Sequence, residues 1–222
     1  MGPPQAEEAL RKCISFGADD AILVTDRAFA GADTLATSYA LASAIRKIGS
    51  EQKVDMVFTG KQTIDGDTAQ VGPGIAKRLG LQLLTYVSRI VETDLEKGTI
   101  TVERRGEGGV QVLRTALPCL ITMLENTNEM RFASLPMMIH AAACQVRKWN
   151  KDDAGIEDVT KIGLKGSPTV VSRVFGPTPR AQKAEMMTVE SSSLRDISLN
   201  LLQSIFTVHP TLEQDLVDKL SA

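Results

Sequence analysis

The sequence predicts an α/β protein in which helices cover a parallel sheet, followed by an antiparallel β meander and a C-terminal helical arm. Short apolar runs, typical of buried strands, alternate with amphipathic helical patterns through the first eighty residues. From residue 83 onward, β-branched runs are separated by the turn sequences EKG and GEGG. The chain then ends with two amphipathic helical patterns.

The first helix is expected to begin at Pro3 and Pro4, because the first positions of a helix need no backbone N–H donor. Small and apolar residues then recur on one helical face, and Gly17 is well placed to end the helix. An α/β domain that opens with a helix lacks the strand that would precede it, and its sheet would then expose an unpaired edge in its middle. The sequence therefore predicts either a sheet that begins here or an N-terminally truncated domain.

Two strand–helix pairs follow the first helix. The apolar run AILV at residues 21–24 and the run VDMVF at residues 54–58 read as strands, because each is short and bounded by polar residues. The helix after the first strand spans about residues 34–48 and is expected to end at Gly49. The helix after the second strand runs to Leu79 and is capped by Gly80.

The second half of the chain changes in character. The expected order is a meander at 83–123, a polar loop, a helix at 137–146, an extended connector at 149–168, a strand at 170–175, a linker GPTPRAQ and two terminal helices. We therefore expect a nucleotide-binding α/β domain over residues 1–148. The connector, the strand and the helical arm occupy residues 149–222.

The composition is that of a soluble protein with one sizeable core. Of its 222 residues, 43% are hydrophobic and 23% charged, and the formal net charge of -2 argues against a general electrostatic attraction to nucleic acid or acidic membrane. No apolar run is long enough to span a bilayer, and the N-terminus lacks the layout of a secretion signal. The three cysteines are far apart and odd in number, which indicates a reducing compartment; we expect the cytoplasm. Cys119, before an apolar run, is expected to be a core residue.

The stretch TGKQTIDGDTAQVGPG at residues 59–74 is the most informative local feature. Asp65 and Asp67 fit the start of an EF-hand loop, but Ala69 and Gln70 do not continue the pattern of oxygen donors and glycine. The spacing from Gly60 also fails the P-loop pattern. Neither a calcium loop nor a P-loop is therefore predicted.

The position of this stretch still indicates phosphate binding. It joins a parallel strand to the next helix, at the strand end where open α/β folds bind their ligands. Residues 68–71 would present consecutive backbone N–H groups at a helix start, where the helix dipole also favours an anion. Asp65 or Asp67 is expected to cap the helix. On pattern alone, a capped helix with no ligand is an equally good interpretation.

Three separate motifs resemble the electron transfer flavoprotein beta subunit. The segment GKQTIDGDTAQVGPGIAKRLG is similar to that family's nucleotide-binding segment. The segments VERRGEGGVQVLRTALPCLIT and NEMRFASLPMMIHAA resemble two further family motifs in the same order, and IGLKGSPTVV fits the later portion. The likeness covers residues 1–175.

The resemblance implies a fold of the adenine nucleotide alpha hydrolase type, a Rossmann-like parallel sheet with helices on both faces. It implies a heterodimer with an alpha subunit and a beta-site nucleotide that is either FAD or AMP. The version DGDTAQVGP at residues 65–73 is similar to that of flavin-bifurcating and nitrogen-fixation-linked members, so FAD is expected rather than AMP. The flavin ring is expected near TDRAFAGADT. The expected cofactor-binding residues are Gly2, Gly60, Asp65, Gly66, Asp67, Thr68, Ala69, Gln70, Val71 and Gly72.

The implied role is that of an electron-carrier subunit rather than a stand-alone enzyme, with no catalytic residue and no metal site of its own. It would pass electrons between a dehydrogenase and an electron-transport or reductase partner, and flavin-based bifurcation in the complex is left open. Members linked to acyl-CoA dehydrogenases carry a leucine before N-E-P, where the corresponding residues here are Thr127 and Met130. Family members also have a first strand before the segment that matches MGPPQAEEAL. A non-redox, adenine-nucleotide-binding scaffold is the alternative function.

Overall fold

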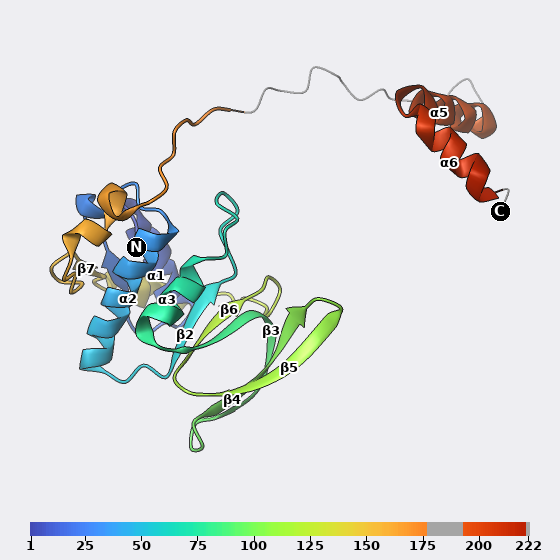
Figure 1. Ribbon diagram of the computed structural model, residues 1–222. Coiled ribbons are helices and arrows are strands. Elements are labelled where there is room, and N and C mark those ends of the chain that lie inside the picture. The colour runs from blue at the N-terminus through green and yellow to red at the C-terminus, as the bar shows by residue number, and fades with distance from the viewer. Residues whose placement is uncertain (177–192, 221–222) are drawn as a thin grey trace. The chain divides into compact units, whose positions relative to one another are not determined.

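Strands and helices alternate through the first eighty residues of the computed structural model, which describes residues 1–176 and 193–220 (Figure 1). The elements of this part are η1 (Pro4–Ala6), α1 (Glu7–Ser15), β1 (Ile22–Val24), η2 (Arg27–Phe29), α2 (Thr34–Glu51), β2 (Met56–Gly60) and α3 (Val71–Leu79). Pro4 opens the first helical turn, and Gly17 has the positive φ expected after a helix end. The predicted order of elements in this part is confirmed.

The ends of the helices show where local signals decide the boundary. The Asp33 carboxylate accepts hydrogen bonds from the N–H groups of Leu35 and Ala36, so it caps α2. Gly80 ends α3 in the left-handed conformation, with φ at 67°, as predicted. The predicted end of α2 at Gly49 is wrong, because the helix continues to Glu51 and Gly49 does not take a positive φ.

The remaining strands follow as β3 (Gln82–Asp94), β4 (Thr99–Gly106), β5 (Gly109–Ala116), β6 (Cys119–Met123) and β7 (Arg147–Trp149). Strands β3, β4 and β5 form the predicted antiparallel meander, a long twisted ribbon (Figure 1). Strand β6 corrects the prediction, because it leaves the meander and lies between β2 and β3, parallel to both. Cys119, Leu120 and Ile121 are fully buried, as expected for a central parallel strand covered on both faces.

The parallel pairs fall into two sheets, β1–β7 and β2–β6–β3–β4–β5. Among the described strands, β1 pairs only with β7, and β2 pairs only with β6. The backbone N–H of Gly2 donates to the carbonyl of Val24 (3.1 Å), so Gly2 lies beside the end of β1.

The core confirms that helices lie on both faces of the β1–β7 sheet. Val24 packs with Ala40 and Ala44 of α2, whereas its neighbour Leu23 packs on the opposite face with Ile14 of α1 and with Ala141. Ala141 belongs to α4 (Leu135–Ala143). Helices α2 and α3 also cover one face of the larger sheet, where Ala42 and Ala76 are buried with Leu120. On the other face of that sheet, side chains of β3, β4 and β6 form their own cluster.

The chain divides into two compact units between Ser172 and Arg173, later than the predicted division at residue 149. Trp149 of β7, Ala154 and Ile162 pack in the core of the first unit, which explains the later division. Two short turns, η3 (Val159–Lys161) and η4 (Gly163–Gly166), lie in this region.

The strand predicted at residues 170–175 is wrong. Residues 169–176 form no strand, and the side chains of Val171 and Val174 are largely exposed rather than paired into a sheet. Apart from Gly176, the predicted linker GPTPRAQ lies outside the described residues. The two predicted terminal helices are present as α5 (Leu194–Val208) and α6 (Pro210–Leu220).

Candidate functional site

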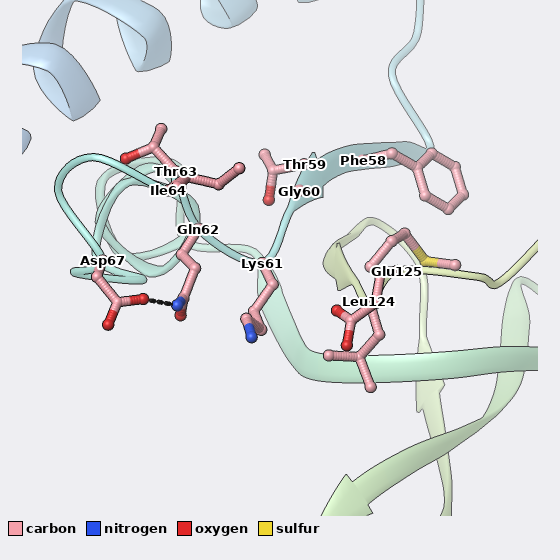
Figure 2. Close-up of a pocket in the computed structure, with 11 residues that line it drawn as sticks. Phe58, Thr59, Gly60, Lys61, Gln62, Thr63, Ile64, Asp67, Leu124 and Glu125 are labelled. Carbon is pink, nitrogen blue, oxygen red and sulfur yellow. Dashed lines mark hydrogen bonds between the residues drawn. The ribbon is translucent and has the colours of Figure 1, made fainter. Parts of the chain in front are cut away.

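The stretch at residues 59–74 joins the end of β2 to the start of α3. Because β6 runs parallel beside β2, the carboxyl ends of the two strands lie together, with Thr59 paired to Thr122 and Gly60 to Met123. The loop therefore lies at the edge where α/β sheets bind ligands, as predicted. Figure 2 shows the loop turning on one side of the end of β2 and the segment Leu124–Glu125 on the other.

Asp67 holds the loop together instead of capping α3. Its carboxylate accepts a hydrogen bond from the side-chain amide of Gln62, and its backbone N–H donates to the carbonyl of Thr63 (3.0 Å). The N-cap of α3 is Gln70, and no side chain caps this helix. The prediction that Asp65 or Asp67 caps α3 is therefore wrong, because the loop turns back on itself before the helix begins.

The uncapped start of α3 presents backbone donors. Within the described chain, the N–H groups of residues 68–72 have no hydrogen-bond acceptor. Ala69 has a positive φ of 53°, and Gln70, which follows it, is right-handed. A left-handed residue followed by a right-handed one turns successive N–H groups toward one concavity, which is a known form of anion site. The positive end of the α3 dipole favours an anion at the same place.

Gly72 lets α3 approach the strands closely. A Cβ atom at this position would lie 2.8 Å from Thr59 Oγ1 and 2.9 Å from Thr122 Cγ2, nearer than real Cβ contacts. Thr59 Oγ1 is buried and has no hydrogen-bond partner within the described residues. A buried hydroxyl without a partner is uncommon, so its place beside the helix start calls for a ligand or water.

The start of α2 is tied to the same loop. Thr34 Oγ1 donates to Gln70 Oε1 (2.7 Å), and a Cβ atom on Gly74 would meet the Ser38 hydroxyl at 2.7 Å. The loops that follow β1 and β2 are thereby joined. Neither Thr34 nor Ser38 was singled out from the sequence, because this contact depends on how α2 and α3 pack.

A cavity of about 880 Å³ lies at the ends of β2 and β6 (Figure 2). Of the predicted cofactor-binding residues, Gly60 and Asp67 line it, together with Lys61 and the Leu124–Glu125 segment. The backbone N–H of Glu125, followed by the charges of Lys61 and Arg105, lowers the pKa of the Glu125 carboxyl. This cavity therefore combines backbone and amide donors with charges of both signs.

A second cavity of about 700 Å³ lies at the end of β1. Gly2 lines it with its neighbours Met1, Pro3 and Pro4, and the residues after β1 complete its wall: Thr25, Asp26, Arg27, Phe29 and Ala30. Part of the segment TDRAFAGADT, where the flavin ring is expected, thus faces this cavity. Hydrogen bonds from the N–H groups of Ala28 and Lys151 lower the pKa of the Asp26 carboxyl.

The structure thus distributes the predicted site residues over three features. Gly60 and Asp67 line the cavity at β2, and Gly2 lines the cavity at β1. The others lie in the loop between β2 and α3 and at the uncapped helix start: Asp65, Gly66, Thr68, Ala69, Gln70, Val71 and Gly72. The Leu124–Glu125 part of the wall was missed, and reading CLIT at residues 119–122 as a buried parallel strand would have found it.

In the part of the chain that the structure describes, no group of three or more histidine, cysteine, aspartate or glutamate residues could hold a metal ion. The same residues include no helix that is long and apolar enough to cross a membrane.

The model of the electron transfer flavoprotein domain matches residues 1–154. Protein FixA from Azotobacter vinelandii is 63% identical over 219 residues, which cover 99% of this chain and 78% of the relative. The caffeyl-CoA reductase-Etf complex subunit CarD from Acetobacterium woodii is 42% identical over 209 residues, or 94% of this chain and 76% of the relative. The electron transfer flavoprotein subunit beta from Clostridium acetobutylicum is 44% identical over 173 residues, which cover 78% of this chain and 64% of the relative.

Proposed function

Because this chain belongs to the electron transfer flavoprotein family as a beta-type member, we propose that it is the beta subunit of a heterodimeric electron carrier and that it binds FAD. The observation that carries the proposal is the uncapped start of α3, where the N–H groups of residues 68–72 have no acceptor in the described chain and a left-handed Ala69 precedes a right-handed Gln70. These donors fit the diphosphate of a dinucleotide.

Two further features support a ligand at this place. Gly72 lets the helix start lie directly on β2 and β6, and the buried hydroxyl of Thr59 beside it has no partner in the described chain. A phosphate oxygen or an ordered water would supply the missing hydrogen bond. Lys61, in the wall of the adjoining cavity, contributes positive charge near the loop.

FAD, when bound, supplies the electron-transfer chemistry, and the protein supplies binding, orientation and electrostatics. The backbone N–H groups of the loop would hold the phosphates, with the charge of Lys61 nearby. In the cavity at β1, the side chain of Phe29 and the apolar rings of Pro3 and Pro4 offer a wall for a ring system. Arg27 in that wall is a cation beside the same space.

FAD is proposed over AMP because Gly66 and Val71 belong to the loop version similar to that of bifurcating members. We also propose an electron transfer flavoprotein alpha subunit as the partner in the heterodimer. A dehydrogenase is proposed as the electron donor, with the segment NEMRFASLP at residues 128–136 as its contact. An acyl-CoA dehydrogenase is the example that the family resemblance implies, and Thr127 and Met130 are the positions at which this chain differs from the members linked to it.

The test is to coexpress the full chain with its alpha-type subunit, purify the complex and measure the nucleotides released on denaturation. Two FAD per heterodimer are expected. One FAD and one AMP would overturn FAD as the beta-site nucleotide. A colourless, monomeric chain that releases a nucleotide other than FAD would favour the non-redox scaffold.

A matched pair of variants makes this test specific to the loop. Gly72→Ala places a methyl group at the start of α3, where it has no room, and is expected to lose the beta-site nucleotide. Gly49→Ala makes the same chemical change where no atom lies within 4 Å, and it is expected to retain the nucleotide. Equal nucleotide content in both variants would remove the α3 start from the proposed site.

A further inference from the structure

Helix α4 is attached to the body of the protein by very little packing. Among its nine residues only Ala141 is buried, whereas Leu135, Met138 and Ile139 are exposed. The segment before the helix exposes Phe132 completely. Helices of this length are not stable by themselves, so some other interaction must hold α4 in place.

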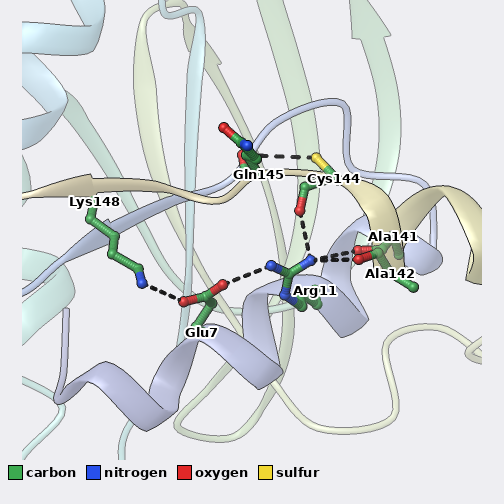
Figure 3. Close-up of polar contacts among 7 residues, drawn as sticks. All are labelled: Glu7, Arg11, Ala141, Ala142, Cys144, Gln145 and Lys148. Atoms are coloured by element: carbon green, nitrogen blue, oxygen red, sulfur yellow. Dashed lines mark hydrogen bonds and ion pairs between the residues drawn. The ribbon is translucent and has the colours of Figure 1, made fainter.

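That interaction is made by Arg11 of α1 (Figure 3). Its Nη1 donates to the carbonyl oxygens of Ala141 (3.0 Å), Ala142 (3.1 Å) and Cys144 (2.6 Å). These carbonyls lie at the end of α4, where a helix lacks donors of its own for its last carbonyls. The positive charge of the guanidinium also complements the negative end of the helix dipole.

Glu7 fixes the direction of the Arg11 side chain. Arg11 Nη2 donates to Glu7 Oε1 (2.8 Å), and the other carboxylate oxygen pairs with Lys148 Nζ of β7 (2.8 Å) (Figure 3). Because a guanidinium is planar and donates in fixed directions, holding Nη2 on Glu7 aims Nη1 at the end of α4. The Arg11 and Glu7 side chains are only 33% and 22% exposed, so solvent competes with these contacts less than at an open surface.

The opposite end of the α1–α4 contact is hollow. A cavity of about 300 Å³ lies between the end of α1 and the start of α4, lined among others by Phe16, Arg131 and Met137. The helix is therefore fastened at its C-terminal end, by Arg11 and the Ala141 methyl. At its N-terminal end, next to the segment 130–134, it faces open space.

We propose that Arg11 is a positioning residue that fixes the C-terminal end of α4 and thereby the direction of the segment 128–136. The use of that segment as a partner contact rests on the proposed function, whereas the fastening of α4 does not. Loss of Arg11 would remove none of the exposed apolar side chains of α4, but it would release the helix that presents them.

The experiment compares Arg11→Met with Lys12→Met in the full chain coexpressed with its alpha-type subunit. Lys12 is the matched control, because it is an exposed cation on the same helix whose contact is with the Phe16 ring. Hydrogen exchange of the amides at residues 137–143 is expected to be about tenfold faster in Arg11→Met and unchanged in Lys12→Met. Trypsin cleavage after Arg131 is expected to become faster in parallel.

Arg11→Lys separates positioning from general stability. A lysine keeps the charge and reaches a carbonyl, but it cannot bind Glu7 and the helix end together, so it is expected to restore part of the protection. Unchanged exchange of residues 137–143 in Arg11→Met would overturn the proposal. So would an equal increase throughout β1 and α2, because Arg11 would then stabilise the whole unit rather than position α4.

If Arg11→Met does not fold, Glu7→Gln provides the second variant. It leaves Arg11 in place and removes the charge that aims it. Exchange at residues 137–143 is expected to rise relative to that of β1 and α2, though less than tenfold; no such relative rise would overturn the proposal. The exchange measurement needs no flavin. A wild-type complex without FAD would therefore refute the proposed function and leave the result on Arg11 intact.

Discussion

Replacement of Gly72 by alanine tests whether the start of α3 packs on the two strands as the structure shows. The added Cβ atom would lie over the Thr59–Thr122 pair of β2 and β6, at 2.8 Å from Thr59 Oγ1. This is 0.6 Å short of the 3.4 Å at which ordinary contact begins. Both neighbours are β-branched, with few rotamers, and both belong to paired strands, so the helix start has to move instead.

The expected cost follows from two opposing effects. Forcing a methyl group into a closely packed site costs about 1–3 kcal/mol. Alanine gains up to about 1 kcal/mol over glycine in a helix, and less in the first turn. The net loss is about 1–2 kcal/mol, which lowers the Tm of a domain of this size by about 2–8 °C. Gly49→Ala in α2 has no neighbour within 4 Å and is expected to raise the Tm by a few degrees.

The assay is thermal and urea unfolding of both variants beside the wild type, without added nucleotide. A fall in Tm for Gly72→Ala together with a rise for Gly49→Ala is the diagnostic result, because the chemical change is identical in the two variants. A Gly72→Ala protein as stable as the wild type would refute the close approach of α3 to β2 and β6. It would also remove the steric reason for a glycine at this position.

Three further predictions concern single side chains. Thr59→Val, without nucleotide, is expected to raise the free energy of unfolding by up to about 1 kcal/mol, because it replaces a buried hydroxyl that has no partner; urea unfolding checks this. Hydrogen bonds from Lys148, then Arg11, lower the pKa of Glu7 below its ordinary value of 4.5. The folded chain therefore binds fewer protons than the unfolded chain. The ionised Glu7 carboxylate stabilises the fold fully above pH 4.5, and this stabilisation is lost as the pH falls through the folded pKa. The wild type is expected to have a higher urea midpoint than Glu7→Gln at pH 6 and to lose that advantage toward pH 3. Burial raises the pKa of the Cys119 thiol, so iodoacetamide at pH 8 is expected to modify Cys119 only after unfolding, as mass spectrometry would show.

The features that were predictable from the sequence depend on nearby residues. Gly80 ends α3 because a left-handed residue is needed there, and the need arises from the helix itself. Gly49 carries the same signal but lies inside α2, because the hydrogen bonds and packing of that longer helix outweigh one glycine. The position of residues 59–74 between a strand and a helix was predictable for the same local reason.

The neighbours of that loop were not predictable in this way. The run CLIT at residues 119–122 continues the spacing of the meander, and an antiparallel strand was expected there. It pairs instead with β2, some sixty residues earlier, and this pairing brings Glu125 to Lys61. Turn spacing carries no information about such a partner. The uninterrupted apolar run Cys119, Leu120 and Ile121 does carry such information. All three residues are buried, and strands buried on both faces are typical of parallel sheets.

The character of the loop also differs from what its glycines suggest. Gly66 does not take a positive φ, whereas Asp67 and Ala69 do, at 47° and 53°. A left-handed conformation costs an ordinary residue roughly 1–2 kcal/mol, so the surrounding contacts must hold these two in place. For Asp67 the contacts are those with Gln62 and Thr63, and for Ala69 the next residue, Gln70, is tied to Thr34. A turn that only connected β2 to α3 would have no use for this strain. We propose that this strain serves to aim backbone N–H groups, because those of residues 68–72 lack an acceptor in the described chain.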